Sequence, residues 1–498
     1  MVRSFILAAS LLLTSFDEKK EEERGLAFEK EGNFHQALEV YRSLYEQHRE
    51  DMDLLCKVGR MYGMIKEWSS AEAALKECLQ KDPGNVDAEA FLSYVYYWQG
   101  KYQEAKVLAE KIIREHPNYM EVHLLMGGLL HAERHYESAY QKYLLCFQKE
   151  PSNRLAERGL IATKPLVRPS IEARSLYVQE REQDLLTPVT TTQMTTINEA
   201  LTLIYPINDR WRPYLEGVYD LQIQHNLVAK VNNYQVNSYF QNIGTFVQFG
   251  NFWTLDLESR IHFARNKGGS NLLPFHNRTL WEPQAELRYT TPDHFFILSG
   301  EVDSLIARLF PINQSQLIAR KGVTTAYEYR FQAPFNGIGG TGNVAWYGHS
   351  VPNREHGYSA WVRFRIPSAV PDFLIRYEFA YKGFHKVVGA YNSFKWRNQH
   401  LARVTYHKEW MPKGYFDLSY SWLWSDTHQL TDQTEIILPG EANIPTPIQK
   451  NIFHANIVDV LFHYVARQSI HFEGRGRYYH DTNRYRAWAL FGSFEYVF

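Results

Sequence analysis

The chain ends on WALFGSFEYVF, residues 488–498, and this stretch decides the fold of the C-terminal part. Large apolar side chains recur at every second position, with one gap at a glycine. One face therefore carries Trp488, Leu490, Phe494, Tyr496 and Phe498. A period of two is that of a β-strand, in which successive side chains point to opposite faces of a sheet. The stretch predicts a strand that is apolar on one side up to its last residue.

The same alternation extends upstream through most of the chain. At 253–263, Leu255 and Leu257 alternate with Asp256 and Glu258, and similar splits occur at 281–289, 358–366, 373–381, 416–424 and 470–478. Many of these strands are about 9–13 residues long, whereas strands of soluble sheets average about 5–6 residues. A strand needs about 9–11 residues to cross a bilayer at its tilt, and its ends often carry Trp or Tyr. We therefore expect a transmembrane antiparallel β-barrel over 171–498 with about 14–16 strands; a soluble β domain is the alternative.

The first third has a different period, of 34 residues. Alanine recurs at 37, 71, 105 and 139, and small residues recur at Gly25, Gly59, Ser93 and Gly127. Bulky residues recur at 28, 62, 96 and 130 and again at 41, 75 and 143, with Ala109 the exception, and prolines close three repeats at 83, 117 and 151. This is the tetratricopeptide pattern, in which pairs of helices stack into a solenoid.

These observations predict an α + β chain with two domains. We expect an N-terminal α-solenoid of four tetratricopeptide repeats plus a capping helix over 18–162, a linker over 163–170, and then the barrel. Solenoids of this kind bind proteins on their concave face, where we expect Tyr94, Tyr97 and Trp98 of the third repeat. Packing against the neighbouring repeat is the alternative role for these three rings.

The N-terminus carries a short apolar run, from Phe5 to Leu13, after the charge of Arg3. This is typical of a secretory signal peptide, which we place at 1–16; the start of the first helix is the alternative. The formal net charge is −1 and the pI is about 7.1, which does not favour nucleic acid as a partner. No apolar run is long enough for a transmembrane helix.

The three cysteines, Cys56, Cys78 and Cys146, all lie in the repeats and their spacing matches no metal motif. We interpret them as small buried apolar residues, with a Cys56–Cys78 disulfide as the less favoured alternative. Residues 337–342 match G-x-G-x-x-G, but no amphipathic helix follows, so we interpret 336–343 as a loop and not as a nucleotide site. We expect no catalytic residue, metal site or cofactor, because no hydrolase or metal-ligand spacing is present.

The polar faces of the strands supply the candidates for a pore lining. Charges of both signs on one wall keep it wet without trapping one kind of solute, and an inward aromatic ring could stack on a sugar. The candidates are Asp256, Glu258, Arg260, Glu286, Arg288, Trp361, Arg363, Arg365, Arg376, Glu378, Arg475 and Arg477. The alternative for each single charge is a salt bridge that stiffens the wall.

The combination of signal peptide, repeats, barrel and aromatic terminus resembles the bacterial exopolysaccharide export porins of the poly-N-acetylglucosamine and cellulose type, and YaiO-type barrels in outline. The resemblance implies an outer-membrane location with the repeats in the periplasm, surrounded by outer-membrane lipid. It implies recognition of Phe494, Tyr496 and Phe498 by the barrel-assembly machinery, a periplasmic protein partner in the repeat groove, and export of a polysaccharide or other polar polymer. A general porin and a plugged structural or adhesive protein are the alternatives.

Overall fold

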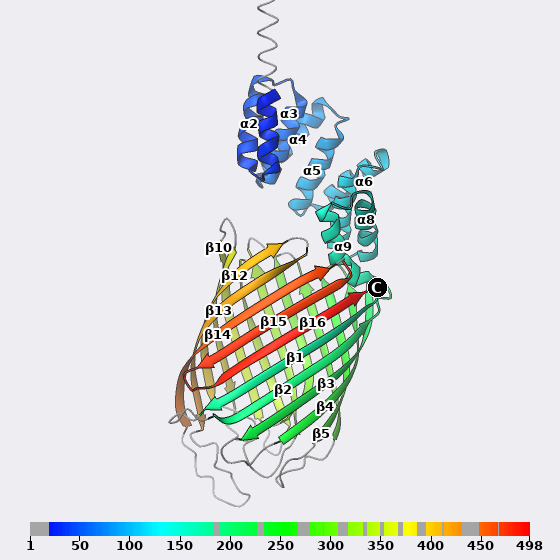
Figure 1. Ribbon diagram of the computed structural model, residues 1–498. Coiled ribbons are helices and arrows are strands. Elements are labelled where there is room, and N and C mark those ends of the chain that lie inside the picture. The colour runs from blue at the N-terminus through cyan, green and yellow to red at the C-terminus, as the bar shows by residue number, and fades with distance from the viewer. Residues whose placement is uncertain are drawn as a thin grey trace, which may run out of the picture. The chain divides into compact units, whose positions relative to one another are not determined.

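The computed structural model describes residues 19–183, 190–226, 234–266, 278–291, 293–306, 317–331, 336–348, 353–366, 372–385, 395–410, 413–430, 448–466 and 468–498. The expected signal peptide at 1–16 lies outside these residues. The chain divides into two compact units, the first ending at Gly159 and the second comprising Leu160–Phe498. Figure 1 shows a helical first unit and a barrel as the second.

The first unit is built from pairs of antiparallel helices, as the 34-residue period predicts. After a helix at 19–30 come α2 (Phe34–Gln47), α3 (Met52–Met64), α4 (Trp68–Lys81), α5 (Val86–Trp98), α6 (Tyr102–Glu115), α7 (Met120–Ala132) and α8 (Tyr136–Lys149). The first helices of three successive pairs begin at 52, 86 and 120. Side chains at the N-caps of α3 and α5 accept backbone hydrogen bonds, which satisfies N–H groups that a helix start leaves free.

Close contact within each pair depends on the small residues of the repeat. A Cβ atom on Gly127 would lie 2.8 Å from the ring of Tyr143, and one on Gly59 would lie 2.8 Å from Cγ of Leu75. The small residue is therefore covered by the second bulky position of the repeat, on the following helix. The third repeat has Ser93 in place of glycine, and it carries the smaller Ala109 at the facing position. This compensation explains why Ala109 departs from the pattern.

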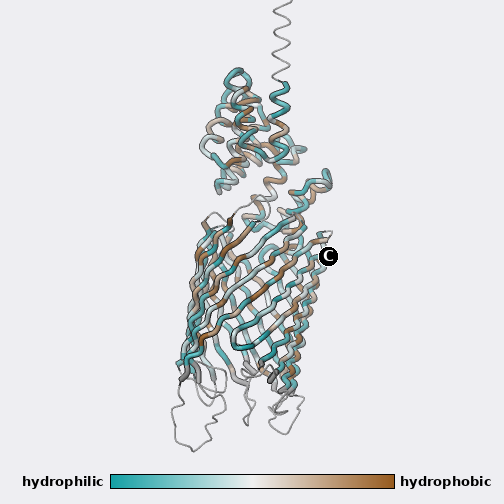
Figure 2. The backbone as a smooth tube through the Cα atoms, turned by 60° about the vertical axis from the view of Figure 1, so that its left-hand side comes forward, coloured by the Kyte–Doolittle hydropathy of each residue, from teal (hydrophilic) through white to brown (hydrophobic). Residues whose placement is uncertain are grey.

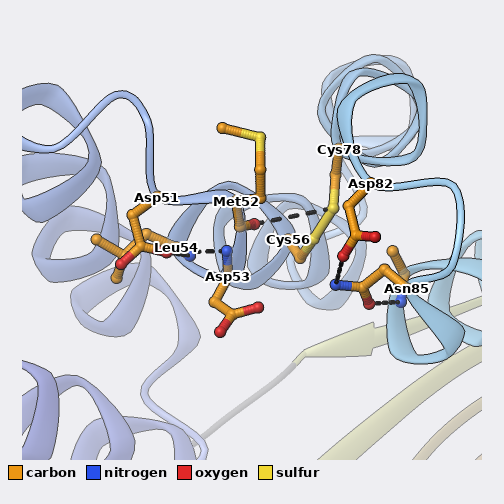
Figure 3. Close-up of a disulfide and its surroundings, with 9 residues drawn as sticks. Asp51, Met52, Asp53, Leu54, Cys56, Cys78, Asp82 and Asn85 are labelled. Atoms are coloured by element: carbon orange, nitrogen blue, oxygen red, sulfur yellow. Dashed lines mark hydrogen bonds between the residues drawn. A yellow bond between two sulfur atoms is a disulfide. The ribbon is translucent and has the colours of Figure 1, made fainter.

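A disulfide joins Cys56 of α3 to Cys78 of α4, so our preferred interpretation of these two cysteines was wrong (Figure 3). Their Cα atoms are 5.9 Å apart, within the range that a disulfide requires. The two cysteines lie on facing turns of one helix pair. Their separation of 22 residues in the sequence does not by itself show that they are in contact. Cys146, at the position equivalent to Cys78, is buried and free, as expected.

The segment that we expected to be a linker is mostly helical. Helix α9 runs over Arg154–Val167, past the predicted end of the capping helix, and the first strand begins at Ser170. The N–H of Arg168 donates to the carbonyl of Lys164 at 2.9 Å, so helical bonding continues beyond Pro165. The Lys164 ammonium also donates to the Val497 carbonyl at 3.1 Å, which fixes the end of α9 to the last strand of the barrel.

The second unit is a closed antiparallel barrel in which each strand pairs with the next and β1 pairs with β16. Its sixteen described strands agree with the expected number. They are β1 (Ser170–Gln183), β2 (Thr190–Ile204), β3 (Trp211–Asn226), β4 (Tyr234–Phe249), β5 (Trp253–Asn266), β6 (Arg278–Thr290), β7 (His294–Ile306), β8 (Leu317–Arg330), β9 (Gly337–Gly348), β10 (Asn353–Ile366), β11 (Asp372–Phe384), β12 (Trp396–Trp410), β13 (Gly414–Leu430), β14 (Ile448–Ala466), β15 (Ile470–Asp481) and β16 (Arg486–Val497).

The two ends of the barrel differ in the length of their connections. The connections at 205–210, 250–252, 291–293 and 467–469 lie at the end where β1 starts and β16 finishes. The opposite end has longer connections, such as 267–277, 307–316 and 431–447. For the longest of these connections, β13 extends to Leu430 and β14 starts at Ile448, and residues 431–447 lie outside the described part of the chain.

The glycine-rich segment that we interpreted as a loop forms β9, so that interpretation was wrong. β9 pairs with β8 and β10 over its whole length. The glycines serve packing: a Cβ atom on Gly339 would lie 2.5 Å from Cζ2 of Trp361. Because Gly339 has no side chain, the indole ring of Trp361 can pack against the backbone of β9.

Candidate functional site: the barrel lumen and the repeat surface

The outer wall of the barrel is apolar and exposed. Leu215 is 51% exposed, Ile243 65%, Trp281 66% and Leu490 55%, although each lies in the middle of a paired strand. Apolar and polar residues alternate along the strands, which is visible as alternating brown and teal in Figure 2. An apolar outer wall of this kind is typical of a barrel whose outside contacts lipid.

All twelve candidates for the pore lining lie on the other, inward face of their strands. The register aligns Asp256 with Glu286 and Thr254 with Arg288. These inward residues alternate along β5 and β6 with outward residues such as Leu257 and Trp281. Farther around the barrel, Arg363 of β10 aligns with Arg376 of β11. The candidates thus lie on three parts of the wall, namely β5 and β6, β10 and β11, and β15.

The group on β5 and β6 has an excess of acidic side chains. The Arg260 guanidinium is 2.9 Å from the Glu258 carboxylate, and Arg288 pairs with Glu286. The Tyr214 hydroxyl of β3 donates to Glu258 at 2.8 Å and reaches Asp256 at 3.4 Å. The carboxylates are thus held in place by donors from the wall.

A second group, which surrounds Asp459 of β14, has an excess of arginines. Oδ1 of Asp459 is 2.6 Å from Nε of Arg477 and 3.4 Å from Nη2 of Arg475, and Oδ2 is 3.7 Å from Nη2 of Arg403. The Asp459 side chain is only 8% exposed, whereas those of Arg475 and Arg477 are 44–45% exposed. Neither Asp459 nor Arg403 was among the predicted residues, although alternation in IVDVLF (457–462) places Asp459 on the polar face.

The two groups face each other across the lumen. Strands eight positions apart in a closed barrel of sixteen lie on opposite walls, so β5 and β6 oppose β13 and β14. One aspartate among three arginines leaves a net charge of about +2 there. On the other wall, the carboxylates of Asp256, Glu258 and Glu286 outnumber the guanidinium groups of Arg260 and Arg288. The charges are mixed locally, and the excess charge has opposite signs in the two groups.

Trp361 of β10 faces the lumen, but its ring is partly covered. The guanidinium carbon of Arg376 lies 4.6 Å from the ring centroid and that of Arg363 lies 5.5 Å from it. Arg363 is in turn 3.0 Å from the carboxylate of Glu328 on β8. A sugar that stacks on this indole would have to displace a cation–π contact, so the ring is a weaker stacking platform than the sequence suggested.

A Ser–His–Glu chain of hydrogen bonds crosses β4, β5 and β6. His262 Nε2 lies 3.0 Å from the Ser238 hydroxyl, and His262 Nδ1 lies 2.9 Å from Glu282. This is the order of a nucleophile, a base and an orienting carboxylate. All three residues are 1–2% exposed, and Phe240 stacks on the imidazole at 4.2 Å. Because Ser238 is closed off, we interpret the chain as part of the wall.

On the repeats, the structure separates the three predicted partner-binding residues. Trp98 is 40% exposed and lies 6.0 Å from the Trp68 ring and 5.5 Å from the Tyr94 ring. The Tyr94 hydroxyl donates to the backbone carbonyl of Glu121 on α7 at 2.8 Å. Tyr97 packs into the core shared by α5, α6 and α7, and burial raises the pKa of both tyrosines. All three rings therefore contact a neighbouring repeat, and Trp98 is the one of the three that is also exposed.

None of the helices in the described part of the chain has the length and apolar character of a membrane-spanning helix. The same part of the chain contains no cluster of three or more His, Cys, Asp or Glu side chains placed to hold a metal ion.

Comparisons with known proteins identify the helical unit. Residues 66–129 match the family model of the tetratricopeptide repeat. The first unit is a tetratricopeptide-repeat array. A search of curated protein sequences finds no match.

Several solved structures are similar to parts of the chain. One, described as a bacterial polysaccharide outer membrane secretin, is similar over 66% of this chain and 98% of its own, with 10% identity and a TM-score of 0.44. A crystal structure of MamA protein covers 29% of this chain and 80% of its own, with 17% identity and a TM-score of 0.24. A thermophilic tetratricopeptide-repeat protein of Thermus thermophilus has the same coverage and identity and a TM-score of 0.28.

Proposed function

We propose that this protein is an outer-membrane channel that exports a polysaccharide or another polar polymer, with its repeats docking a periplasmic protein. The observation that carries the proposal is that the strands of the barrel have an apolar outer face and a charged inner face. Lipid satisfies the first and water the second, whereas a soluble barrel of this size would leave side chains such as Ile243 and Trp281 in water.

The ends of the barrel support the orientation. In bacterial outer-membrane barrels the short turns face the periplasm and the long loops face outward. Here the repeats join the barrel through α9 at the end with short connections, next to Val497. The repeats would therefore be periplasmic. The outward-facing Phe494 and Tyr496, with Phe498, would serve as the terminal signature that the barrel-assembly machinery recognises.

The inner wall favours a hydrated neutral or weakly charged polymer. The exposed guanidinium groups of Arg475 and Arg477 can donate hydrogen bonds to hydroxyls, while the carboxylates on β5 and β6 can accept them. Most of these groups also have a partner in the wall, so a passing hydroxyl exchanges one hydrogen bond at a time and no position becomes a deep trap. The ion pairs keep the charged side chains along the wall, and the exposed arginines contact the solute.

The channel is tested with purified protein in planar bilayers. We expect a barrel that migrates differently on gels when boiled, a stable conductance, and a reversible block of that conductance by added neutral oligosaccharides. Conductance without a block would favour a general porin. A heat-modifiable barrel without conductance would show a plugged lumen and contradict the proposal.

The docking function of the repeats is tested at Trp98. We expect Trp98→Ala to weaken the capture of a periplasmic partner from a cross-linked cell envelope without changing the melting temperature. Val107→Ala, at another exposed residue of the same repeat, is the matched control. If both variants capture the same protein as well as the wild type does, the Trp98 surface is not the docking site.

A further inference from the structure

A carboxylate lies on the lipid-facing side of the barrel, at Glu199 of β2. The register places it in one outward row with Ser175 of β1 and Tyr219 of β3. Its outward neighbours along β2 are Ile197 and Leu201, and Leu201 is 48% exposed. Glu199 is itself exposed, and its side chain has no hydrogen bond or ion pair among the described residues. An ionisable side chain in an apolar belt is costly, which indicates that it has a partner in the membrane.

The outer wall is hollowed next to this carboxylate. A groove of about 1000 Å³ runs across the closure between β16 and β1 and reaches Glu199. Its floor includes Gly217, Gly474 and Gly492, where an added Cβ atom would meet no atom within 4 Å. Aromatic rings border the groove, namely Phe462, Phe472, Phe494, Tyr219 and Tyr239. A second wall could approach the backbone closely here, because small residues at a membrane interface permit tight packing.

The groove also contains a hydrogen-bond donor, the amide of Gln241 on β4. Gln241 is exposed, faces outward beside Gly217 in the register, and has no side-chain hydrogen bond among the described residues. Glu199 and Gln241 stand two strands apart, with Gly217 on the strand between them. A carboxylate and an amide are complementary, but this separation prevents them from bonding within one barrel.

The two side chains lie at the same depth in the membrane. The register aligns Glu199 of β2, through Tyr219 of β3, with Tyr239 of β4, about 10 Å away across the strands. Because the strands are tilted by about 40°, Tyr239 lies about 6 Å farther along the barrel axis, toward the end with long connections. Moving two residues along β4, from Tyr239 to Gln241, returns about 5 Å. A two-fold axis along the membrane normal exchanges positions of equal depth, and such an axis passing near Gly217 would bring Glu199 opposite the partner's Gln241.

We propose that this face joins two copies of the chain in the membrane, with Glu199 of each copy accepting a hydrogen bond from Gln241 of the partner subunit. The proposal rests on the membrane location in the proposed function. A two-fold interface is self-complementary, so one donor and one acceptor per copy form two bonds. An acyl chain could fill the groove, but it has no donor and would leave the carboxylate unsatisfied. A second copy satisfies both polar groups.

Cysteine cross-linking tests the contact directly. We expect Gly217→Cys to form a disulfide-linked dimer in isolated outer membranes under mild oxidation. Ile375→Cys is the matched control: Ile375 is an exposed outward residue of β11, far from the groove around the barrel, and its variant should remain monomeric. Absence of the Gly217→Cys dimer would overturn the proposal, as would cross-linking of this cysteine to a different protein.

A swap of the two side chains tests the pairing. Gln241→Glu alone places carboxylates opposite one another, and we expect it to weaken dimerisation at least about tenfold. The double variant Glu199→Gln/Gln241→Glu recreates the pair with its members exchanged and should restore the dimer. Failure of the swap to restore it would contradict the proposed contact. Heat-modifiability of each variant reports folding, so a conducting monomeric barrel refutes the dimer alone, whereas loss of the barrel from the outer membrane refutes the proposed function.

Discussion

Replacement of Asp459 by asparagine should make the lumen prefer anions more strongly. Asp459 is the single carboxylate among Arg403, Arg475 and Arg477, so the neutral amide raises the local charge from about +2 to about +3 while it keeps the shape of the side chain. The two exposed arginines would then act on solutes without the counter-charge that the wall now supplies.

The magnitude follows from the dimensions of the barrel. Sixteen strands about 4.8 Å apart and tilted by about 40° give a backbone radius of about 16 Å. A side-chain charge then lies about 10 Å from the axis, where one unit charge changes the energy of a monovalent ion by about 0.4 kcal/mol in water. This is a factor of about 2 for each sign of ion, or about 2–4-fold in the anion-to-cation permeability ratio.

The assay is the reversal potential of the channel across a salt gradient in a planar bilayer. At about 0.01 M salt the shift should be near its full size, and at about 1 M salt it should nearly vanish, because the screening length falls from about 30 Å to about 3 Å. Asp459→Glu keeps the charge and should behave as the wild type, and Arg477→Gln should shift the ratio toward cations. A folded, conducting Asp459→Asn channel with unchanged selectivity would show that ions do not pass this wall.

Further predictions concern the repeats. Cys56 and Cys78 should react with a maleimide only after reduction, because they form a disulfide. Cys146 should react slowly in the folded protein, because burial raises the pKa of its thiol to about 11. Mass spectrometry of the labelled protein checks both expectations, and fast labelling of Cys78 without reductant would contradict the disulfide. The hydrogen bond from Lys76 lowers the pKa of Glu72 from 4.5 to about 2, so its contribution to stability is present above the ordinary carboxyl pKa and is lost as the pH falls from about 4.5 toward 2. Thermal melts of the wild type and Glu72→Gln should converge over that range; a constant difference in melting temperature would show that the ion pair is not its source.

The 34-residue period and the alternation were sufficient to predict both units. Each signal repeats many times, so single departures such as Ala109 do not obscure it. The elements that were predicted wrongly are local. Four of the first six residues of β9 are glycine, so this half of the strand has few side chains to alternate, and Gly339 lies against Trp361. The linker was expected over 163–170, but α9 continues to Val167, and Lys164 bonds the end of this helix to the last strand.

The sequence by itself determined which side chains face the lumen, because a period of two fixes the face of every residue once the strand is placed. Only the tertiary structure decided which of them meet. The register of β12, β14 and β15 gathers three arginines around Asp459, and the closure of β1 on β16 puts the acidic group of β5 and β6 on the opposite wall. The register of β2, β3 and β4 sets Glu199 and Gln241 at one depth beside Gly217. Such relations depend on which residues pair across neighbouring strands and on the closure of the barrel, and the alternation within a single strand records neither.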